Sequence, residues 1–260
     1  MRGASSTLKL SAVTKRYGGL VAVADLSLAI APGSIHGLVG PNGAGKSTTI
    51  SIAAGFVRPD SGGITFGGRD LGRMAPEAIA GLGIARTFQQ ATPLAGLSVF
   101  ENVLVGLHTR YRANLVSVLT RSPACRSEAR AMERSVDTLL ENFGLAAQAN
   151  ADARTLTFGQ LRFLEIARAI ARGPAILLLD EPAAGLNEDE RERLAALIRG
   201  FRDRGMGVLL VDHDVPFVFG LCDRMTVMNF GSVIASGNPD AIHRDPAVRE
   251  AYLGDPDTAG

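Results

Sequence analysis

Apolar and polar positions along the chain follow two patterns that predict strands. Residues 8–10 and 26–30 alternate between apolar and polar side chains, as half-buried strands do. Residues 35–39, 175–179 and 208–211 are largely continuous apolar runs, which are typical of strands covered on both faces. Because helical stretches separate these runs, the sequence predicts an α/β core with a mainly parallel sheet.

Helices are predicted from periodicity and from capping residues. Residues 48–54 predict a buried helix that directly follows the strand at 35–39 and a short glycine-rich loop. Another helix is predicted at 164–171. Asn187 and Glu190 occupy the N-cap and capping-box positions of a third helix, which precedes the apolar run at 208–211.

The middle of the chain has a helical pattern instead of the alternation seen on either side. One apolar helical face there consists of Met132, Val136, Leu139, Leu140 and Phe143, and Gly144 stands where a helix-ending glycine belongs. We therefore predict that residues 90–153 form a helical subdomain inserted into an α/β core of residues 1–89 and 154–260.

Composition and charge narrow the range of partners. The chain has 260 residues, of which 46% are hydrophobic and 20% charged, and its formal net charge of +1 gives no basic excess for a nucleic-acid partner. No apolar run approaches the ~20 residues that cross a bilayer, and residues 1–7 lack the apolar core of a signal peptide. Cys125 and Cys222 lie outside any C-x-x-C pattern, which favours a reduced cytosolic compartment.

A glycine-rich stretch between a strand and a helix carries the strongest chemical signal. Residues 40–48 fit G-x-x-x-x-G-K-[ST], a phosphate-binding loop whose glycines let backbone N–H groups point at phosphate oxygens. Lys46 is expected to reach the β- and γ-phosphates, and the Ser47 hydroxyl to bind Mg²⁺. The predicted nucleotide contacts of this loop are Gly40, Pro41, Asn42, Gly43, Ala44, Gly45, Lys46, Ser47 and Thr48.

Two carboxylates follow the buried strand at 175–179. Ligands of open α/β sheets bind outside the carboxyl ends of the strands, which is where Asp180 and Glu181 stand. We expect Asp180 to hold Mg²⁺, directly or through water, and Glu181 to orient the water that attacks the γ-phosphate. A pair of this kind alone is more often a solvated turn, but the complete phosphate loop favours catalysis.

Leu156–Gln160 (LTFGQ), shortly before that strand, resembles the LSGGQ signature of ABC ATPases. The resemblance extends over essentially the whole chain. It implies a single ABC ATPase domain of the P-loop NTPase fold, in which an N-terminal antiparallel β region joins the mainly parallel sheet and the helical subdomain contacts a permease. ATP and Mg²⁺ are the cofactors that it implies.

Further positions match the motifs of this family, and the resemblance implies their roles. Tyr17 matches the aromatic residue that stacks on adenine, and Gln89 matches the glutamine that links the metal site to the helical subdomain. Ala183–Asn187 matches the D-loop, and His213 matches the switch histidine. The resemblance therefore assigns catalysis to Glu181, His213 and Gln89, and the metal to Ser47, Gln89 and Asp180.

In this family each ATP lies between the phosphate loop of one subunit and the signature of another. Thr157, Gly159 and Gln160 are accordingly the implied contacts to the γ-phosphate across a dimer interface. Thr157 replaces the common serine, whereas Leu161 and Phe163 stand where a polar glutamine and a basic arginine are more typical. These departures leave the hydrolysis rate and the choice of partner open.

Three stretches resemble the ATPase subunits of branched-chain amino-acid uptake systems in bacteria. They are residues 101–108, 180–187 and 237–254, and segment 110–127 resembles the longer of the two ATPase subunits in those systems. The implied partners are transmembrane permease subunits, a second ABC ATPase subunit and, indirectly, a periplasmic binding protein. A heterodimer is expected, with a homodimer as the alternative, in the cytoplasm on the inner face of the membrane.

Several alternatives stay open at this point. ATPase subunits of urea and amide importers look similar to this chain. A soluble ABC ATPase of DNA repair or translation is disfavoured, because those chains usually carry a second cassette or long coiled-coil insertions. A non-catalytic ATP-binding module is motivated by the altered signature, but the intact catalytic positions oppose it. A kinase or small GTPase would leave the signature unexplained.

Overall fold

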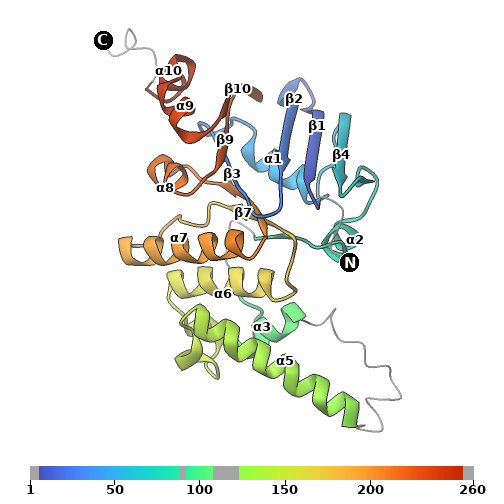
Figure 1. Cartoon of the computed structure of the whole chain (residues 1–260), viewed down its shortest axis with the longest axis vertical. Helices are drawn as coiled ribbons and strands as arrows, with labels where there is room; N and C mark the ends of the chain where they lie inside the picture. The colour runs from blue at the N-terminus through green and yellow to red at the C-terminus, as the bar shows by residue number, and fades with distance from the viewer. Residues whose placement is uncertain (1–5, 88–91, 108–122, 254–260) are drawn as a thin grey trace. The chain divides into compact units, whose positions relative to one another are not determined.

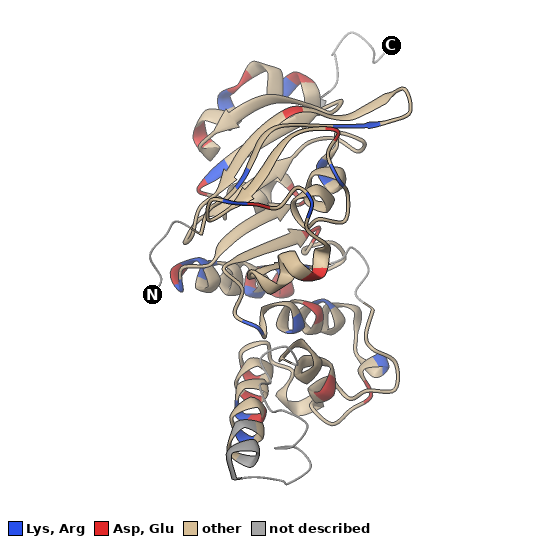
Figure 2. Cartoon of the chain, turned by 90° about the vertical axis from the view of Figure 1, so that its right-hand side faces the viewer, with Lys and Arg blue, Asp and Glu red and all other residues tan. Residues whose placement is uncertain are grey.

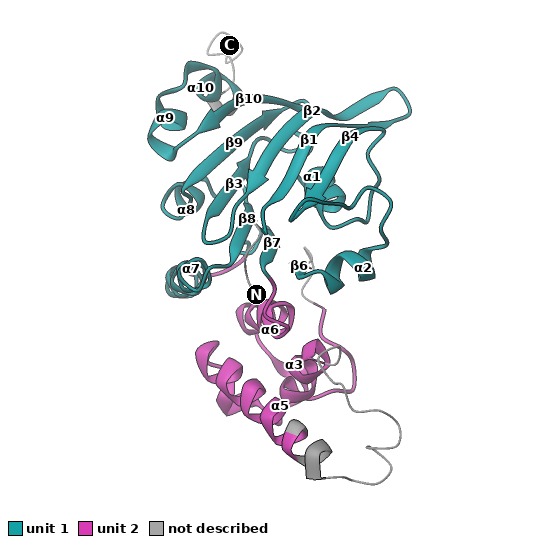
Figure 3. Cartoon of the chain, turned by 45° about the vertical axis from the view of Figure 1, so that its right-hand side comes forward, with its two compact units in different colours: residues 1–86, 175–184, 188–260 teal, residues 87–174, 185–187 magenta. Residues whose placement is uncertain are grey.

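The computed structural model of the chain describes residues 6–87, 92–107 and 123–253. It divides into two compact units, which Figure 3 shows in different colours. The core unit comprises residues 1–86, 175–184 and 188–260, and the helical unit comprises residues 87–174 and 185–187. Residues 154–174, which the sequence analysis placed in the core, belong to the helical unit in this division.

A six-stranded sheet forms the centre of the core unit, in the order β10-β9-β3-β8-β7-β6 (Figure 1). Strands β3, β6, β7, β8 and β9 are parallel, and β10 pairs with β9 in the antiparallel sense. Every residue of β3, β7 and β8 is buried, which confirms the prediction of strands covered on both faces. The strands are β3 (Ile35–Val39), β6 (Ile84–Arg86), β7 (Ile176–Asp180), β8 (Gly207–Val211), β9 (Arg224–Asn229) and β10 (Ser232–Gly237).

A second sheet of the core unit is antiparallel, in the order β2-β1-β4-β5. Its strands are β1 (Leu8–Tyr17), β2 (Leu20–Ile30), β4 (Ser61–Phe66) and β5 (Arg69–Asp70). The N-terminal antiparallel region is thus confirmed. Tyr17 ends β1 and pairs with Leu20, and Gly18 and Gly19 form the turn between β1 and β2.

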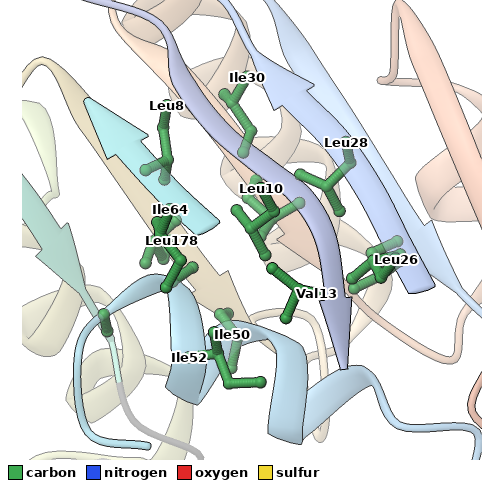
Figure 4. Packing of buried hydrophobic residues seen from close by; sticks show 14 of the residues in the cluster. Leu8, Leu10, Val13, Leu26, Leu28, Ile30, Ile50, Ile52, Ile64 and Leu178 are labelled. Carbon is green, nitrogen blue, oxygen red and sulfur yellow. The ribbon is translucent and has the colours of Figure 1, made fainter. Parts of the chain in front are cut away.

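Helix α1 (Lys46–Ala53) contacts both sheets, because it packs against β2 of the antiparallel sheet and against β7 and β8 of the parallel sheet. Figure 4 shows how Leu10 and Val13 from β1, Ile50 from α1 and Leu178 from β7 point into one apolar cluster. Burying apolar surface on both sides of α1 fixes its orientation. The loop that precedes α1 is held in place by the same packing.

Strand register brings three loops to one edge of the parallel sheet. Leu38 of β3 pairs with Val211 of β8, and Val211 pairs with Asp180 of β7. These three residues therefore form one row across the sheet. The chain segments that follow them start side by side, at the carboxyl edge where α/β proteins bind ligands.

The core unit contains five further helices. Helix α7 begins at Glu188, directly after Asn187, as predicted, and it buries Leu194, Ile198 and Phe201. The helices are α2 (Pro76–Gly81), α7 (Glu188–Asp203), α8 (Val215–Phe219), α9 (Pro239–Arg244) and α10 (Pro246–Leu253).

The helical unit is built from α3 (Val99–Leu107), α5 (Pro123–Asn142) and α6 (Phe158–Ile170), with 3-10 turns at Ala146–Gln148 and Ala153–Thr155. Val136 and Leu140 of α5 and Phe143 directly after it are buried, which confirms the predicted apolar face. Helix α6 begins six residues before the predicted start at Leu164, because Thr157 caps it. The sequence analysis missed this capping box.

Charge is distributed evenly over the part of the chain that the structure describes. Figure 2 shows basic and acidic residues interspersed along the ribbon. Within the described ranges, no helix combines the length and apolar character needed to cross a membrane.

The buried His36 in strand β3 should make the stability of the chain depend on pH. His36 is 4% exposed, and its Nε2 lies 2.9 Å from Thr226 Oγ1. Burial lowers the pKa of His36 to about 4. In the unfolded chain the His36 imidazole has a pKa of ~6.5, so it becomes protonated as the pH falls below ~6.5. In the folded chain the buried imidazole stays neutral over the same range, so the proton favours the unfolded state. We expect a loss of about 2 kcal/mol in the free energy of unfolding between pH 7 and pH 5 from this group.

Urea denaturation of the full chain at pH 7 and pH 5 measures this loss. His36→Leu removes the titrating group, so the variant should lose less stability over the same interval. Equal losses in the two proteins would contradict the assignment to His36.

Candidate nucleotide-binding site

The loop between β3 and α1 owes its shape to glycines that lie against neighbouring backbone. Gly40 and Gly45 have positive φ angles of 154° and 101°. A Cβ on Gly40 would collide with Met228 O of β9, and a Cβ on Gly45 would collide with Ala22 O of β2. Gly43 also has a positive φ, of 81°, but open space surrounds it. Only glycine fits at the first two positions without moving a strand.

The N-terminal end of α1 faces this loop. Gly45 is the N-cap residue, no side chain among the described residues accepts a hydrogen bond there, and the first turn contains no acidic residue. The first amide N–H groups of a helix have no partner inside the helix, and the helix dipole favours negative charge at this end. The arrangement therefore fits an anion such as a phosphate.

Lys46 places a positive charge beneath the same loop. Its side chain is 6% exposed, and Nζ donates hydrogen bonds to Gly40 O at 2.6 Å and to Pro41 O at 2.9 Å. Burial lowers the pKa of Lys46, whereas the carboxylates of Glu181, Asp180 and Asp212 oppose that shift. The ammonium is thus anchored to the loop and faces a group of acidic side chains.

Asp180 ends β7 and is 2% exposed. Its Oδ2 accepts a hydrogen bond from Arg86 Nη2 at 3.1 Å, and Arg86 Nη1 donates to Ser51 Oγ at 3.1 Å. Ser51 Oγ in turn donates to Ser47 O at 2.6 Å. A chain of hydrogen bonds therefore joins the two residues expected to bind Mg²⁺. The sequence analysis missed Arg86, although its position at the end of β6, beside β7, could have indicated it.

Glu181 occupies a strained backbone position. Its φ of 49° is unusual for a residue with a side chain, and such a conformation persists only where surrounding contacts impose it. The contact here is a hydrogen bond of 2.7 Å from Glu181 N–H to Val211 O. The adjacent strand β8 thus holds the first residue beyond β7.

His213 follows β8 and is exposed, with 60% of its side chain open to solvent. Its Nδ1 lies 3.5 Å from Oδ1 of Asp212, which is fully buried. Asp212 accepts hydrogen bonds from the N–H groups of Ala183 at 3.1 Å and Asp214 at 3.0 Å. Burial raises the pKa of the Asp212 carboxyl, and these two hydrogen bonds oppose the shift. The sequence analysis assigned no role to Asp212.

Tyr17 lies at the end of β1, in the hairpin whose other strand packs against the loop at Gly45. The ring is 49% exposed, and Lys15 Nζ lies 5.5 Å from the ring centroid. An exposed aromatic face beside a phosphate loop is available for stacking on a base.

The signature residues belong to the helical unit, where they form the start of α6. Gln160 N–H donates to Thr157 Oγ1 at 3.3 Å, and Thr157 N–H donates to Gln160 Oε1 at 3.0 Å. This reciprocal capping box leaves the other amides of the first turn available. Gly159 is buried in this turn, whereas Phe158 is exposed and its ring lies where a Cβ on Gly185 would stand.

Two of the unusual signature residues can be placed in the helical unit. Phe163 is buried and meets Phe143, the residue after α5, edge to face, with ring centroids 6.4 Å apart. Leu161 is half-buried. Phe163 therefore serves the packing of α6 within the helical unit, where an arginine could not replace it without burying a charge.

Gln89 lies outside the described residues, as does most of segment 110–127. Cys125 belongs to the first turn of α5, and its side chain is likewise outside the described part. Cys222 is buried, and burial raises the pKa of its thiol.

The donor set of the core unit suits Mg²⁺ bound together with phosphates. Among the residues that the structure describes, no group of three or more His, Cys, Asp or Glu side chains could hold a metal ion alone. Mg²⁺ in nucleotide sites needs only one or two protein oxygens, because water and phosphate oxygens complete its shell. The Ser47 hydroxyl and the Asp180 carboxylate are oxygen ligands of this kind.

Comparison with known proteins gives a consistent result. The family described as ABC transporter matches residues 23–184, and the family described as branched-chain amino acid ATP-binding cassette transporter matches residues 232–258. The high-affinity branched-chain amino acid transport ATP-binding protein LivG of Salmonella typhimurium is 41% identical over 250 residues, covering 95% of this chain and 98% of LivG. The corresponding protein BraF of Pseudomonas aeruginosa is 40% identical over 250 residues, again covering 95% and 98%.

Solved structures show the same fold. The ADP conformation of an ATP-binding cassette of an ABC transporter superposes with a TM-score of 0.82 at 27% identity, covering 97% of this chain and all of that one. A dimeric bacterial ABC transporter cassette superposes with a TM-score of 0.76 at 26% identity, covering 89% and 98%.

The two kinds of loop glycine predict different effects on nucleotide affinity. Gly45→Ala must displace the loop from β2, because its Cβ meets a backbone carbonyl, so we expect affinity for a fluorescent ATP analogue to fall by at least about tenfold. Gly43→Ala meets no atom and strains only its own backbone, which makes it the matched control with a clearly smaller loss. Fluorescence titration of both variants measures the difference, and equal losses would show that packing against Ala22 does not shape the loop.

Proposed function

Because this chain belongs to the ABC transporter ATP-binding proteins, in their branched-chain amino acid group, we propose that it binds and hydrolyses ATP to drive import through a membrane permease. The observation that carries the proposal is the carboxyl edge of the parallel sheet. There the phosphate loop, the buried ammonium of Lys46 and the carboxylates of Asp180 and Glu181 at the end of β7 come together in one unit.

The phosphate loop and Tyr17 account for binding. Amide groups of residues 40–48 and the N-terminus of α1 surround the phosphates, and Lys46 exchanges its hydrogen bonds to Gly40 O and Pro41 O for the β- and γ-phosphate oxygens. Tyr17 stacks on the adenine. Ser47 and Asp180 hold Mg²⁺, which, when bound with ATP, neutralises the charge that develops on the phosphates.

Hydrolysis requires a water molecule placed in line with the γ-phosphate. Glu181 accepts a hydrogen bond from this water and favours its attack, and His213 helps to position the same water by accepting its other hydrogen. Gln89 is proposed to link the metal site to the helical unit. The positive φ of Glu181 supports this role, because strained backbone conformations cluster at functional sites.

A second subunit completes the site in this proposal. Thr157, Gly159 and Gln160 of one subunit present the start of α6 to the γ-phosphate held by the other, so that ATP joins the two subunits and its hydrolysis separates them. A relative solved as a dimeric cassette supports this arrangement. We propose a heterodimer with a second ABC ATPase, with a homodimer as the alternative.

The location and partners follow from the same assignment. We propose that the chain lies on the cytoplasmic face of the bacterial membrane, bound through its helical unit to permease subunits, while a periplasmic binding protein delivers the solute. Branched-chain amino acids are the proposed cargo, since the relatives LivG and BraF are named for their transport and the C-terminal match covers residues 232–258. Urea and amides are the alternative cargo.

Exchanging the proposed catalytic carboxylate tests the function directly. Glu181→Gln keeps the side-chain shape but removes the charge, so ATP should still bind while the steady-state ATPase rate of the assembled transporter falls by about 10²-fold or more. The variant should also accumulate as an ATP-bound dimer in size-exclusion chromatography.

Glu188→Gln, an exposed carboxylate at the start of α7, is the matched control and should hydrolyse ATP normally. Normal turnover by Glu181→Gln would refute the assigned role. A wild-type chain that binds ATP but never hydrolyses it, with its permease present, would favour the non-catalytic module.

The proposed cargo has its own test. Cells that lack this chain should lose uptake of labelled leucine and recover it when the wild-type chain, but not Glu181→Gln, is supplied. Uptake of labelled urea in the same cells is the comparison. Loss of urea uptake with unchanged leucine uptake would instead assign the protein to the urea and amide importers.

A further inference from the structure

Asp212 is a buried carboxylate that touches two functional loops at once. It stands between β8 and His213 and is fully buried. Its Oδ2 accepts the N–H of Ala183, the first residue of the D-loop, at 3.1 Å. Its Oδ1 accepts the N–H of Asp214 at 3.0 Å and lies 3.5 Å from His213 Nδ1. Both oxygens are thus engaged, and each faces a different loop.

Burying a carboxylate costs free energy, and a simple turn does not require one here. A buried charge is retained only where hydrogen bonds or opposite charges compensate it. The compensating partners of Asp212 are backbone groups of two loops that leave the sheet at its ligand-binding edge. The carboxylate therefore lies where these two loops meet.

We propose that Asp212 is a positioning residue that fixes His213 with Nδ1–H towards the Asp212 carboxylate and the Nε2 acceptor towards the attacking water, and ties this orientation to the D-loop. The inference rests on the proposed function, because it specifies how His213 is prepared for hydrolysis. A carboxylate beside one ring nitrogen determines which nitrogen carries the proton and how the ring points. At 3.5 Å the contact is long for a hydrogen bond in the nucleotide-free chain, and catalytic contacts of this kind shorten on binding.

The hydrogen bond from Ala183 N–H gives the Asp212 carboxylate a second role. In the proposed dimer the start of α6 meets the ATP of the other subunit, and Phe158 at that start lies against Gly185 of the D-loop. A shift that reaches Ala183 would move the Asp212 carboxylate and with it the imidazole. Asp212 joins dimer closure to the orientation of His213 in this way. The neighbouring Val211 adds to the link, because its carbonyl accepts the N–H of Glu181 at 2.7 Å.

Asp212→Asn is the decisive variant. An amide keeps the shape of the side chain but offers one acceptor oxygen, so its NH₂ group must face a donor, either at Ala183 or at the side of His213 and Asp214. We expect kcat for ATP hydrolysis in the assembled transporter to fall by at least tenfold, with KM for ATP changed less than threefold, because the phosphate loop is untouched. Asp214→Asn is the matched control. It keeps the helix cap of α8 and leaves the Asp212 carboxylate in place, so both constants should stay within twofold.

A spectroscopic measurement separates positioning from a general structural role. The ring nitrogens of ¹⁵N-histidine in the full-length chain, without nucleotide, report which nitrogen carries the proton, and His213→Gln identifies the signal of His213 among those of four histidines. We expect the Nδ1–H form in the wild type and in Asp214→Asn, and loss of this preference in Asp212→Asn.

Each result decides the inference. A wild-type chain with the proton on Nε2 overturns it, even if Asp212→Asn does not fold. An unchanged His213 signal in a folded Asp212→Asn variant, or a changed signal with an unchanged kcat, overturns it as well. A wild type without ATPase activity would instead refute the proposed function, and the ring-nitrogen signal would then decide the Asp212 contact alone.

Discussion

The buried ammonium of Lys46 is the interaction on which the nucleotide site depends. Lys46 is 6% exposed, so its buried charge must be compensated. Loop carbonyls accept its hydrogen bonds, and three carboxylates at the ends of strands β7 and β8 oppose the loss of its proton. Those carboxylates can only gather because β3, β8 and β7 are parallel and in register, so that their carboxyl ends form one row. The sheet topology therefore determines where the charges of the site lie.

Hydrogen bonds link the loops of this row into a network. Arg86 joins Asp180 to α1 through Ser51, and β8 holds both Glu181 and Ala183 through Val211 and Asp212. Each functional loop of the core unit is thus attached to at least one other through a buried or half-buried polar group. Polar contacts in a low-dielectric interior are strong when every partner is present, so a change at one loop affects its neighbours.

The altered signature is explained by packing within the helical unit. Phe163 fills the contact with Phe143, and the neighbouring Arg162 and Glu165 form a buried ion pair at 3.0 Å. The Phe163 departure therefore lies on the face of α6 that stabilises the unit. Thr157, Gly159 and Gln160, which form the first turn, keep the capping box and the amides that a phosphate would use. An aromatic substitution one turn further along does not remove the function of that end.

The sequence predicted the features that local patterns encode, and it missed those that arise from distant contacts. Continuous apolar runs identified β3, β7 and β8, and the phosphate-loop motif identified the residues that precede α1. Arg86 and Asp212 have no local signature, because their roles come from pairing with Asp180 and Ala183, which lie 94 and 29 positions away. The start of α6 was missed for a different reason, since the capping box T-x-x-Q was read only as part of a nucleotide motif. The same four residues would serve both purposes in the proposed function, because the amides that a helix leaves open at its first turn are groups suited to bind a phosphate.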